Sequence, residues 1–437
     1  MSKKLHLISL GCNKNLVDSE VMLGRLREYE ITQDISEADV IIVNTCGFIE
    51  AAKSESINTI LDAHSQRKEN SLLVVSGCLT ERYKEELSRE IPEVDIFTGV
   101  GDYDRIDELI SLKQSSFTPQ VYLANENSPR VITGSKYHAY VKLSEGCNQT
   151  CSFCAIPGFK GKLKSRTIDS VVTEVQNLLE QGFRDFSFIS QDTSSFGRDL
   201  GKRDALIDLI EQIELLPGIK SARILYLYPS TTTFELIDKI ADSKIFRTYY
   251  DMPIQHISDK MLKIMKRGFG KEKTIELLNY MRQKENSFVR SAVIVGHPGE
   301  SENDFNELKE FLKNFNFDRF SVFEYSNEEN TAAYTMEQID SDTIRERADI
   351  LGEIAKESMQ KSLNKLIGKD IELVIDGVSD EHEYLLSARA LDWAPEIDGE
   401  ILVNDSGDFS VEHGEFFKAQ VTEVVDVVAL ATLKERL

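Results

Sequence analysis

Residues 145–154 read EGCNQTCSFC, and the three cysteines in this stretch, Cys147, Cys151 and Cys154, indicate the fold of the centre of the chain. Clusters of the 4Fe–4S type are usually held by cysteine sulfur, so three thiolates can bind three of the four irons. No cysteine follows Cys154, which would leave the fourth iron open. A structural zinc ion is the alternative, and it would need a fourth ligand such as His138 or His256.

The triad directly follows an apolar run, residues 138–146, that predicts the first strand of a central series of strands and helices. Five further runs have strand character, and helical segments separate them: residues 185–192, 222–229, 248–256, 288–296 and 319–325. A full eight-unit barrel typically uses about 250 residues. Six strands over about 230 residues therefore predict a partial (β/α) barrel, closed by a charged helix over residues 341–366.

Upstream, three β-rich runs each end in a cysteine: LHLISLGC at Cys12, DVIIVNTC at Cys46 and LLVVSGC at Cys78, with spacings of 34 and 32 residues. A segment of helical period follows each run, which predicts an open parallel α/β domain. Open α/β sheets bind ligands at the carboxyl ends of their strands, so the three thiols should meet at one edge. The alternative is that each is a small buried apolar side chain.

Charge is unevenly distributed along the chain, whose net charge is −23. Residues 370–437 hold 17 acidic against four basic side chains, a net of −13, and their Val- and Ile-rich pattern predicts a small all-β barrel. Such a charge disfavours broad nucleic-acid binding and favours a basic partner.

A polar linker near residues 115–134 gives the domains 1–125, 133–366 and 369–437. We expect no membrane span and a cytoplasmic location.

Several of these segments resemble the methylthiotransferase branch of the radical S-adenosylmethionine (SAM) enzymes. They are CNQTCSFCAIPGFKGKLKSR, SLGCNKNLVDSEVMLG, NTCGFIEAAKSESI and VSGCLTERY, and the tail resembles the TRAM-type barrel of the same branch. The resemblance implies two 4Fe–4S clusters. Cys147, Cys151 and Cys154 would bind the radical SAM cluster, and Cys12, Cys46 and Cys78 an auxiliary one. It also implies two SAM per turnover: one methylates a sulfur of the auxiliary cluster, and the other yields the radical that removes a substrate hydrogen.

Five residues are expected to contact SAM: Phe153 and Gly296 because of the resemblance, and Gln191, Asp192 and Gln255 because they end predicted strands. Phe153 matches the aromatic residue that shields the adenine, although ordinary packing explains it equally well. Gln191 and Asp192 end a predicted strand, where site residues concentrate, but a helix cap is the alternative. Gly296 lies in VIVGHPGES, which resembles the strand and turn that contact the adenine. The basic run from Lys160 to Arg166 is expected to meet a carboxylate or to lie in solvent.

The family divides between enzymes that modify an adenosine of tRNA and one that modifies an aspartate of ribosomal small-subunit protein S-twelve. SLGCNKNLVDSE, CAIPGFKGKLKSR and SQDTSSFGRDL resemble the second branch, and the acidic tail suits a basic protein better than RNA. We therefore predict formation of 3-methylthio-aspartate on protein S-twelve or on the small ribosomal subunit. A flavodoxin or ferredoxin would donate electrons to a monomeric enzyme. The alternatives are tRNA methylthiolation and a non-catalytic iron–sulfur or zinc protein that binds the ribosome.

Overall fold

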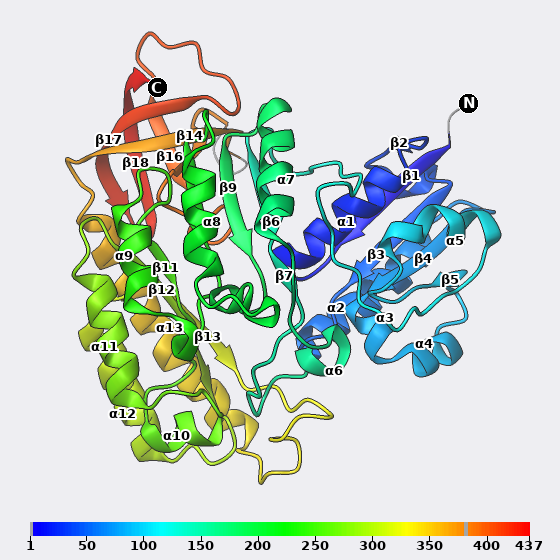
Figure 1. Ribbon diagram of the computed structural model, residues 1–437, viewed down its shortest axis with the longest axis horizontal. Coiled ribbons are helices and arrows are strands. Elements are labelled where there is room, and N and C mark those ends of the chain that lie inside the picture. Colours follow the sequence, from blue (N-terminus) through cyan, green and yellow to red (C-terminus); the bar gives the residue numbers. More distant parts are fainter. Residues whose placement is uncertain (1–2, 380–382) are drawn as a thin grey trace.

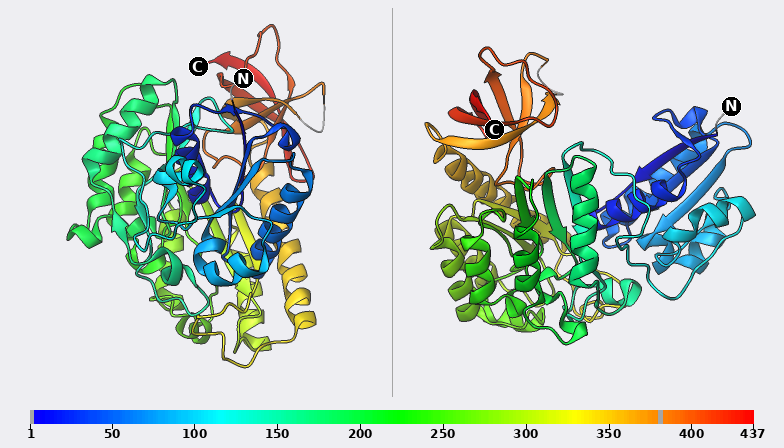
Figure 2. Two further views of the ribbon diagram at one scale, coloured as in Figure 1. Left: turned by 90° about the vertical axis from the view of Figure 1, so that its right-hand side faces the viewer. Right: turned by 45° about the horizontal axis from the view of Figure 1, so that its top comes forward.

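The computed structural model describes residues 3–379 and 383–437 and divides them into three units (Figure 1). The N-terminal unit holds an open sheet, the central unit two three-stranded sheets of an incomplete barrel, and the C-terminal unit a closed five-stranded barrel. In Figure 2 the two outer units lie on different sides of the central one. This architecture confirms the predicted fold class.

The N-terminal sheet has the order β2-β1-β3-β4-β5, and all four of its pairings are parallel. Its strands are β1 (Lys4–Ser9), β2 (Glu30–Ile31), β3 (Val40–Thr45), β4 (Leu72–Gly77) and β5 (Ile96–Phe97). Its helices are α1 (Asn13–Arg25), α2 (Glu50–Gln66), α3 (Cys78–Arg82), α4 (Lys84–Glu90) and α5 (Ile106–Leu112). Two 3-10 turns complete it, η1 (Ile35–Glu37) and η2 (Tyr103–Arg105). The three runs that end in cysteine form β1, β3 and β4, and Cys78 is the first residue of α3 after β4. The two-residue strands β2 and β5 were not predicted.

The central unit contains the six predicted strands as two parallel sheets, in the orders β10-β9-β6 and β11-β12-β13. They are β6 (His138–Lys142), β9 (Asp185–Ile189), β10 (Ser221–Ile224), β11 (Tyr249–Asp251), β12 (Phe288–Val295) and β13 (Arg319–Glu324). A small antiparallel pair, β7 (Ser144–Glu145) and β8 (Lys164–Ser165), flanks the triad loop. An isolated bridge between Ala222 and Phe246 connects the two sheets.

Helices cover the outer face of these strands (Figure 1). They are α7 (Ile168–Glu180), α8 (Ala205–Glu214), α9 (Phe234–Asp242), α10 (Asp259–Ile264), α11 (Lys271–Arg282), α12 (Glu302–Phe315) and α13 (Ser341–Asn364), whereas α6 (Ile156–Lys160) lies beside α3 of the N-terminal unit. Short 3-10 turns follow β9 and β10: η3 (Thr193–Ser195), η4 (Arg198–Leu200) and η5 (Pro229–Thr231). Outward-facing side chains of the strands and the helices form one apolar core, which includes Phe186, Phe188 and Val293. Alternation along a strand then turns the intervening residues toward the barrel interior.

The C-terminal barrel closes the end of the central barrel opposite to the cysteine triad. Its strands are β14 (Asp370–Val378), β15 (Leu386–Ala390), β16 (Ile401–Asp405), β17 (Phe416–Val425) and β18 (Val428–Arg436). Asp185, the first residue of β9, is buried and pairs with both Arg223 and Arg389, each at 2.8 Å. Tyr249, the first residue of β11, donates to Asp398 at 2.8 Å. The amino ends of the strands are therefore covered, and the carboxyl ends are left for the site.

The predicted linker is an ordered strap that lies against α1. Gly24 of α1 touches it so closely that a Cβ there would lie 2.2 Å from the carbonyl oxygen of Pro129. The next residue, Arg130, pairs with Glu20 of α1 at 2.6 Å and with Glu174 of α7 at 2.8 Å. The strap thus joins the N-terminal unit to the barrel by buried ion pairs.

Candidate active site

Cys147, Cys151 and Cys154, here called the radical-type triad, lie on a loop that folds back on itself at the carboxyl end of the central barrel. The backbone N–H of Cys147 donates to the carbonyl of Gly161 at 3.1 Å, which closes the loop. Gly146 has φ +75°, and a Cβ there would lie 2.2 Å from the carbonyl oxygen of Lys162. A residue without a side chain is therefore required immediately before the first cysteine.

Hydrogen-bond donors surround the sulfurs of this triad. The N–H of Gln149 donates to Cys147 Sγ at 3.4 Å, and Arg267 Nη1 donates to Cys151 Sγ at 3.2 Å. Tyr228 Oη also lies 3.5 Å from Cys151 Sγ. Burial raises the pKa of Cys147 to about 11 and that of Cys154 to about 12, so metal must displace protons from these thiols. Donors aimed at sulfur suit a bound thiolate, and three thiols without a fourth fit a cluster with one open iron.

Neither histidine proposed as a fourth zinc ligand is available to this triad. His138 begins β6 at the opposite end of the barrel, and its Nε2 is 3.0 Å from Ser187 Oγ. His256 accepts two backbone N–H bonds at Nδ1 and faces Glu300 from Nε2 at 3.3 Å. Across residues 3–379 and 383–437, no three His, Cys, Asp or Glu side chains gather closely enough to hold a single metal ion. In a four-iron cluster each thiolate binds a different iron, so convergence on one point is not required.

The second triad lies at the carboxyl ends of three adjacent strands, as the repeat predicted. Cys12 precedes α1, Cys46 follows β3 and Cys78 begins α3 after β4. Gly11 allows the close approach, because a Cβ there would lie 2.7 Å from Cys46 Cβ and 2.8 Å from its Sγ. Burial raises the pKa of Cys46, and it raises that of Cys78 to about 12. The arrangement places three metal-competent thiols at one sheet edge.

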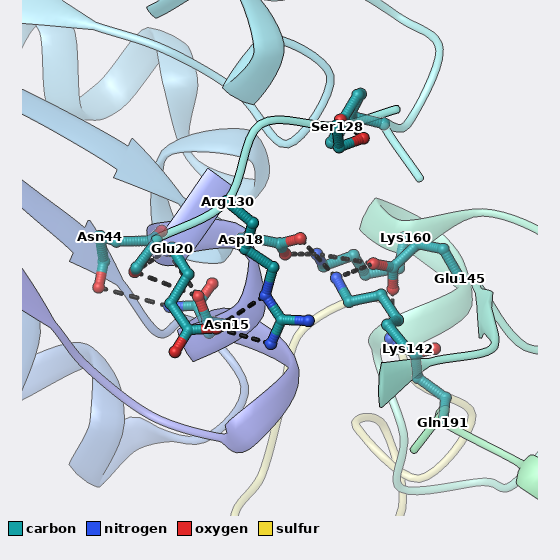
Figure 3. Close-up of polar contacts among 12 residues, drawn as sticks. Asn15, Asp18, Glu20, Asn44, Ser128, Arg130, Lys142, Glu145, Lys160 and Gln191 are labelled. Carbon is teal, nitrogen blue, oxygen red and sulfur yellow. Dashed lines mark hydrogen bonds and ion pairs between the residues drawn. The ribbon is translucent and has the colours of Figure 1, made fainter. Parts of the chain in front are cut away.

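A buried cluster of charges holds the two units together (Figure 3). Lys142 Nζ donates to Asp18 of α1 at 2.5 Å and to Glu145 at 2.9 Å. Lys160, at the end of the helix that follows Cys154, lies 3.5 Å from both carboxylates. Burial alone would raise the pKa of Glu145, but the two lysines lower it below its usual value. Two cations thus balance two anions inside the interface.

This cluster corrects the expectation for the basic run of residues 160–166. Lys160 and Arg166 are buried and paired inside the protein, Lys160 as above and Arg166 with Glu174 of α7. Neither is available to a ligand carboxylate or to solvent, whereas Lys162 and Lys164 are exposed. No local pattern indicates this pairing, because Asp18 precedes Lys160 by 142 residues.

The residues predicted to contact SAM all lie around the carboxyl ends of the barrel strands. Phe153 is half-buried and meets His297 edge-on, with ring centroids 6.3 Å apart. Gly296 has φ +79° and lies beneath Ile344 of α13, which a Cβ there would meet at 2.4 Å. Gln255 has φ +71°, and its carbonyl accepts from the N–H of Ile294 at 2.8 Å. A role for these residues in binding SAM stays a prediction.

Gln191 and Asp192, at the end of β9, have different surroundings. Gln191 donates to Glu145 in the buried charge cluster, and its Oε1 has no hydrogen-bond partner among the described residues. Asp192 caps η3, accepts from Ser195 Oγ at 2.6 Å and from Gln149 Nε2 at 2.7 Å. Since Gln149 lies inside the cysteine loop, Asp192 fixes the loop that carries the triad.

Sequence reasoning missed two side chains that support this loop. His297 accepts from Ser152 Oγ at Nε2 (3.0 Å) and donates to the carbonyl of Pro298 from Nδ1 (2.9 Å). Arg267 bonds Cys151 Sγ and also donates to the carbonyl of Pro253 at 2.6 Å. His297 directly follows the predicted Gly296, so its position in the sequence could have indicated a role at the site. No sequence motif indicated Arg267.

Comparison with known families agrees with this organisation. Residues 4–99 match the model of Uncharacterized protein family UPF0004, residues 141–312 that of the Radical SAM superfamily and residues 367–430 that of the TRAM domain. Among solved structures, a radical SAM methyltransferase, TsrM from Kitasatospora setae, has a TM-score of 0.55 at 15% identity. The alignment covers 76% of this chain and 74% of that one, and it shows a shared fold. Fold and cysteine loop together define a radical SAM enzyme.

Similarity to relatives extends over nearly the whole chain. "Ribosomal protein uS12 methylthiotransferase RimO" of Sulfurovum sp. (strain NBC37-1) is 68% identical, over 99% of this chain and 98% of the relative. The same-named proteins of Aliarcobacter butzleri (strain RM4018) and Campylobacter jejuni (strain RM1221) are 60% and 56% identical over at least 98% of each chain. The chain belongs to the RimO family of ribosomal protein uS12 methylthiotransferases. Membership of the radical SAM superfamily implies a 4Fe–4S cluster and SAM.

Proposed function

We propose that this enzyme converts an aspartate of ribosomal protein uS12 (the small-subunit protein S-twelve) to 3-methylthio-aspartate, using two SAM per turnover. The observation that carries the proposal is that the two units dock beside both cysteine triads: Lys14, two residues after Cys12, packs on Tyr226, and Lys160, six residues after Cys154, pairs with Asp18. A sulfur donor and a radical generator must act on the same carbon atom, so they have to face one substrate site. The names of relatives 56–68% identical support the choice of uS12 as the substrate.

Cys147, Cys151 and Cys154 would hold the cluster that binds SAM, and Cys12, Cys46 and Cys78 a second 4Fe–4S cluster. When bound, the first cluster would supply the electron that cleaves SAM to the radical that removes a substrate hydrogen. The second would supply the methylated sulfur that takes the place of that hydrogen. The chain's own part is to orient and to exclude water. Arg267 and Gln149 orient the first triad, and the Oε1 atoms of Gln191 and Gln255, which have no hydrogen-bond partner among the described residues, would be acceptors for SAM. Phe153, Asp192 and Gly296 would shape the rest of the SAM site.

The C-terminal barrel favours a basic protein over RNA. Of the aromatic side chains that could stack on bases, Trp393, Phe416 and Phe417 are at most 8% exposed and Phe409 is half-buried against Phe417, so they offer little stacking surface, although Tyr384 is exposed. Trp393 instead packs against Arg319 of the central barrel, 5.0 Å from its guanidinium carbon. With a net charge of −13 over residues 370–437, the barrel would attract a basic ribosomal protein and repel tRNA.

Other features of the proposal rest on the sequence. The domains would be residues 1–125, 133–366 and 369–437, with Arg130 in the strap between the first two. A flavodoxin or ferredoxin would supply electrons to a monomer in the cytoplasm. No helix of the described residues is long and apolar enough to cross a membrane.

A competition assay tests the choice of substrate. The anaerobically reconstituted protein is incubated with reductant, methyl-labelled SAM and equimolar uS12 and anticodon-loop RNA. We expect label in uS12 and none in the RNA. Label confined to the RNA would select the tRNA enzyme. Absence of iron and of reductive SAM cleavage would select a non-catalytic binding protein.

A further inference from the structure

Lys14 is a buried cation placed between the two triads. It is the second residue of α1 and lies two residues after Cys12, with only 9% of its surface exposed. Its Nζ lies 3.5 Å from the centre of the Tyr226 ring, which follows β10 in the central barrel. The contact crosses from the N-terminal unit to the barrel, beside an apolar patch that contains Val17, Ile189 and Leu225.

Among the carboxylates that the structure describes, none pairs with the ammonium of Lys14, and this sets it apart from its neighbours in the interface. Lys142 and Lys160 are buried in the same interface, and each lies within 3.5 Å of two carboxylates. Burying a charge is costly unless an opposite charge compensates it, and an aromatic ring compensates only part of that cost. Lys14 is thus a cation with capacity for an anionic ligand.

The loop that carries Tyr226 connects this cation to the radical-type triad. Tyr226 has φ +64°, and it is held there because its N–H donates to Asp251 at 3.0 Å and its carbonyl accepts from Thr193 N–H at 3.0 Å. Two residues later, Tyr228 Oη contacts Cys151 Sγ. One short loop therefore touches Lys14, beside Cys12, and also Cys151. An anion on Lys14 would lie between the two cysteine sets.

We propose that Lys14 binds the side-chain carboxylate of the residue that the enzyme modifies. This inference rests on the proposed function, because it takes an aspartate as the substrate. The β-carbon of aspartate is bonded directly to its carboxyl carbon. A salt bridge from Lys14 to that carboxylate would therefore hold the reacting carbon between the radical source and the sulfur donor. It would also make the enzyme select aspartate over its neutral isostere, asparagine.

The test compares two uS12 loop peptides, one with the target aspartate and one with asparagine in its place. Binding to the reconstituted holoenzyme is measured by fluorescence anisotropy, which does not depend on turnover. Loss of one partner of a buried charge pair typically weakens binding by at least about 30-fold. We expect the unsubstituted enzyme to prefer the aspartate peptide by this factor. Lys14→Met should bind both peptides equally, and Lys14→Arg should restore part of the preference.

Two further measurements separate recognition from damage. Lys14→Met should keep its iron content and its peptide-free cleavage of SAM while methylthiolation falls about 100-fold. Lys84→Met, an exposed lysine on α4 of the same unit, is the matched control and should behave like the unsubstituted enzyme. Retained aspartate preference in Lys14→Met, or loss of its iron or SAM cleavage, would overturn the inference. Failure of the unsubstituted enzyme to modify the aspartate peptide would instead overturn the proposed function.

Discussion

At the scale of single residues, the thiols of Cys46, Cys78, Cys147 and Cys154 are held in surroundings that favour their protonated form. Burial raises the pKa of Cys78 and Cys154 to about 12 and that of Cys147 to about 11. A metal that binds them must supply the free energy that removes these protons. Cluster assembly should therefore be weaker at low pH. Each cluster would be held by the three sulfurs of its own triad.

Replacement of one cysteine from each triad should separate the two roles. Cys46→Ala should retain roughly four irons, the content of one cluster, and cleave SAM, because the loop of Cys147 is unaffected. Methylthiolation should be lost. Cys154→Ala should lose SAM cleavage as well. Iron analysis and chromatography of 5′-deoxyadenosine check both variants, and loss of SAM cleavage in Cys46→Ala with its iron retained would contradict this division.

A second residue-scale prediction concerns pH and stability. Burial lowers the pKa of His138 to about 3, against 6.5 for the exposed ring. The neutral ring contributes fully to the free energy of unfolding above pH 6.5. Below pH 6.5 the His138 ring of the unfolded chain binds a proton, whereas the ring of the folded chain stays neutral down to about pH 3. The free energy of unfolding therefore falls as the pH falls. Between pH 7 and 5.5 the native protein should lose about 1 kcal/mol more than His138→Gln in denaturant titrations. An equal loss in both proteins would refute the assignment.

At the scale of elements, the turn after β1 brings Cys12 and Cys46 together. Gly11 has φ +84° and leaves no space for a Cβ beside Cys46. Gly11→Ala should therefore displace one cysteine from the other and halve the iron content, to roughly four irons. Gly201→Ala is the matched control, because Gly201 has φ +77° with nothing within 4 Å of the added Cβ. It carries similar backbone strain and should keep both clusters, and equal iron loss in the two variants would assign the effect to strain alone.

The elements also mark how far prediction from sequence reached. The six barrel strands were identified because each is a compact apolar run, and the cysteine repeat gave the parallel sheet with its three thiols at one edge. Helix α9 (Phe234–Asp242) falls in one of the intervals where a helical segment was expected, but its bounds could not be set from so short a periodic pattern. The pairing of Lys160 with Asp18 depends on how two units dock, which local periodicity does not encode. For the same reason Lys14 was noticed only as part of a motif.

At the scale of the whole molecule, the two outer units have separate tasks. The N-terminal unit lies over the carboxyl ends of the strands, where Lys53 and Arg82 pair with buried Glu328 at 3.2 and 2.7 Å. The acidic barrel covers the amino ends (Figure 2). Under the proposed function, chemistry and partner attraction would thus be located on different faces of the central unit.

Attraction by the acidic barrel should depend on salt. Exposed charges are screened over about 8 Å at physiological ionic strength, so affinity for uS12 should fall as salt rises. Neutralising the exposed Asp408, Glu412 and Glu423 together should lower the association rate and flatten this salt dependence. Stopped-flow association with uS12 measures both. The triple variant should still cleave SAM, and an unchanged salt dependence would show that the barrel does not attract the substrate.

The central claim is that two clusters act on one aspartate, and site-resolved mass spectrometry of uS12 tests it most directly. After reaction with reconstituted enzyme, SAM and reductant, uS12 should carry one methylthio group on an aspartate side chain. The group should be absent after reaction with Cys46→Ala, although that variant still cleaves SAM. Unmodified uS12, or an equal yield with Cys46→Ala, would contradict the account.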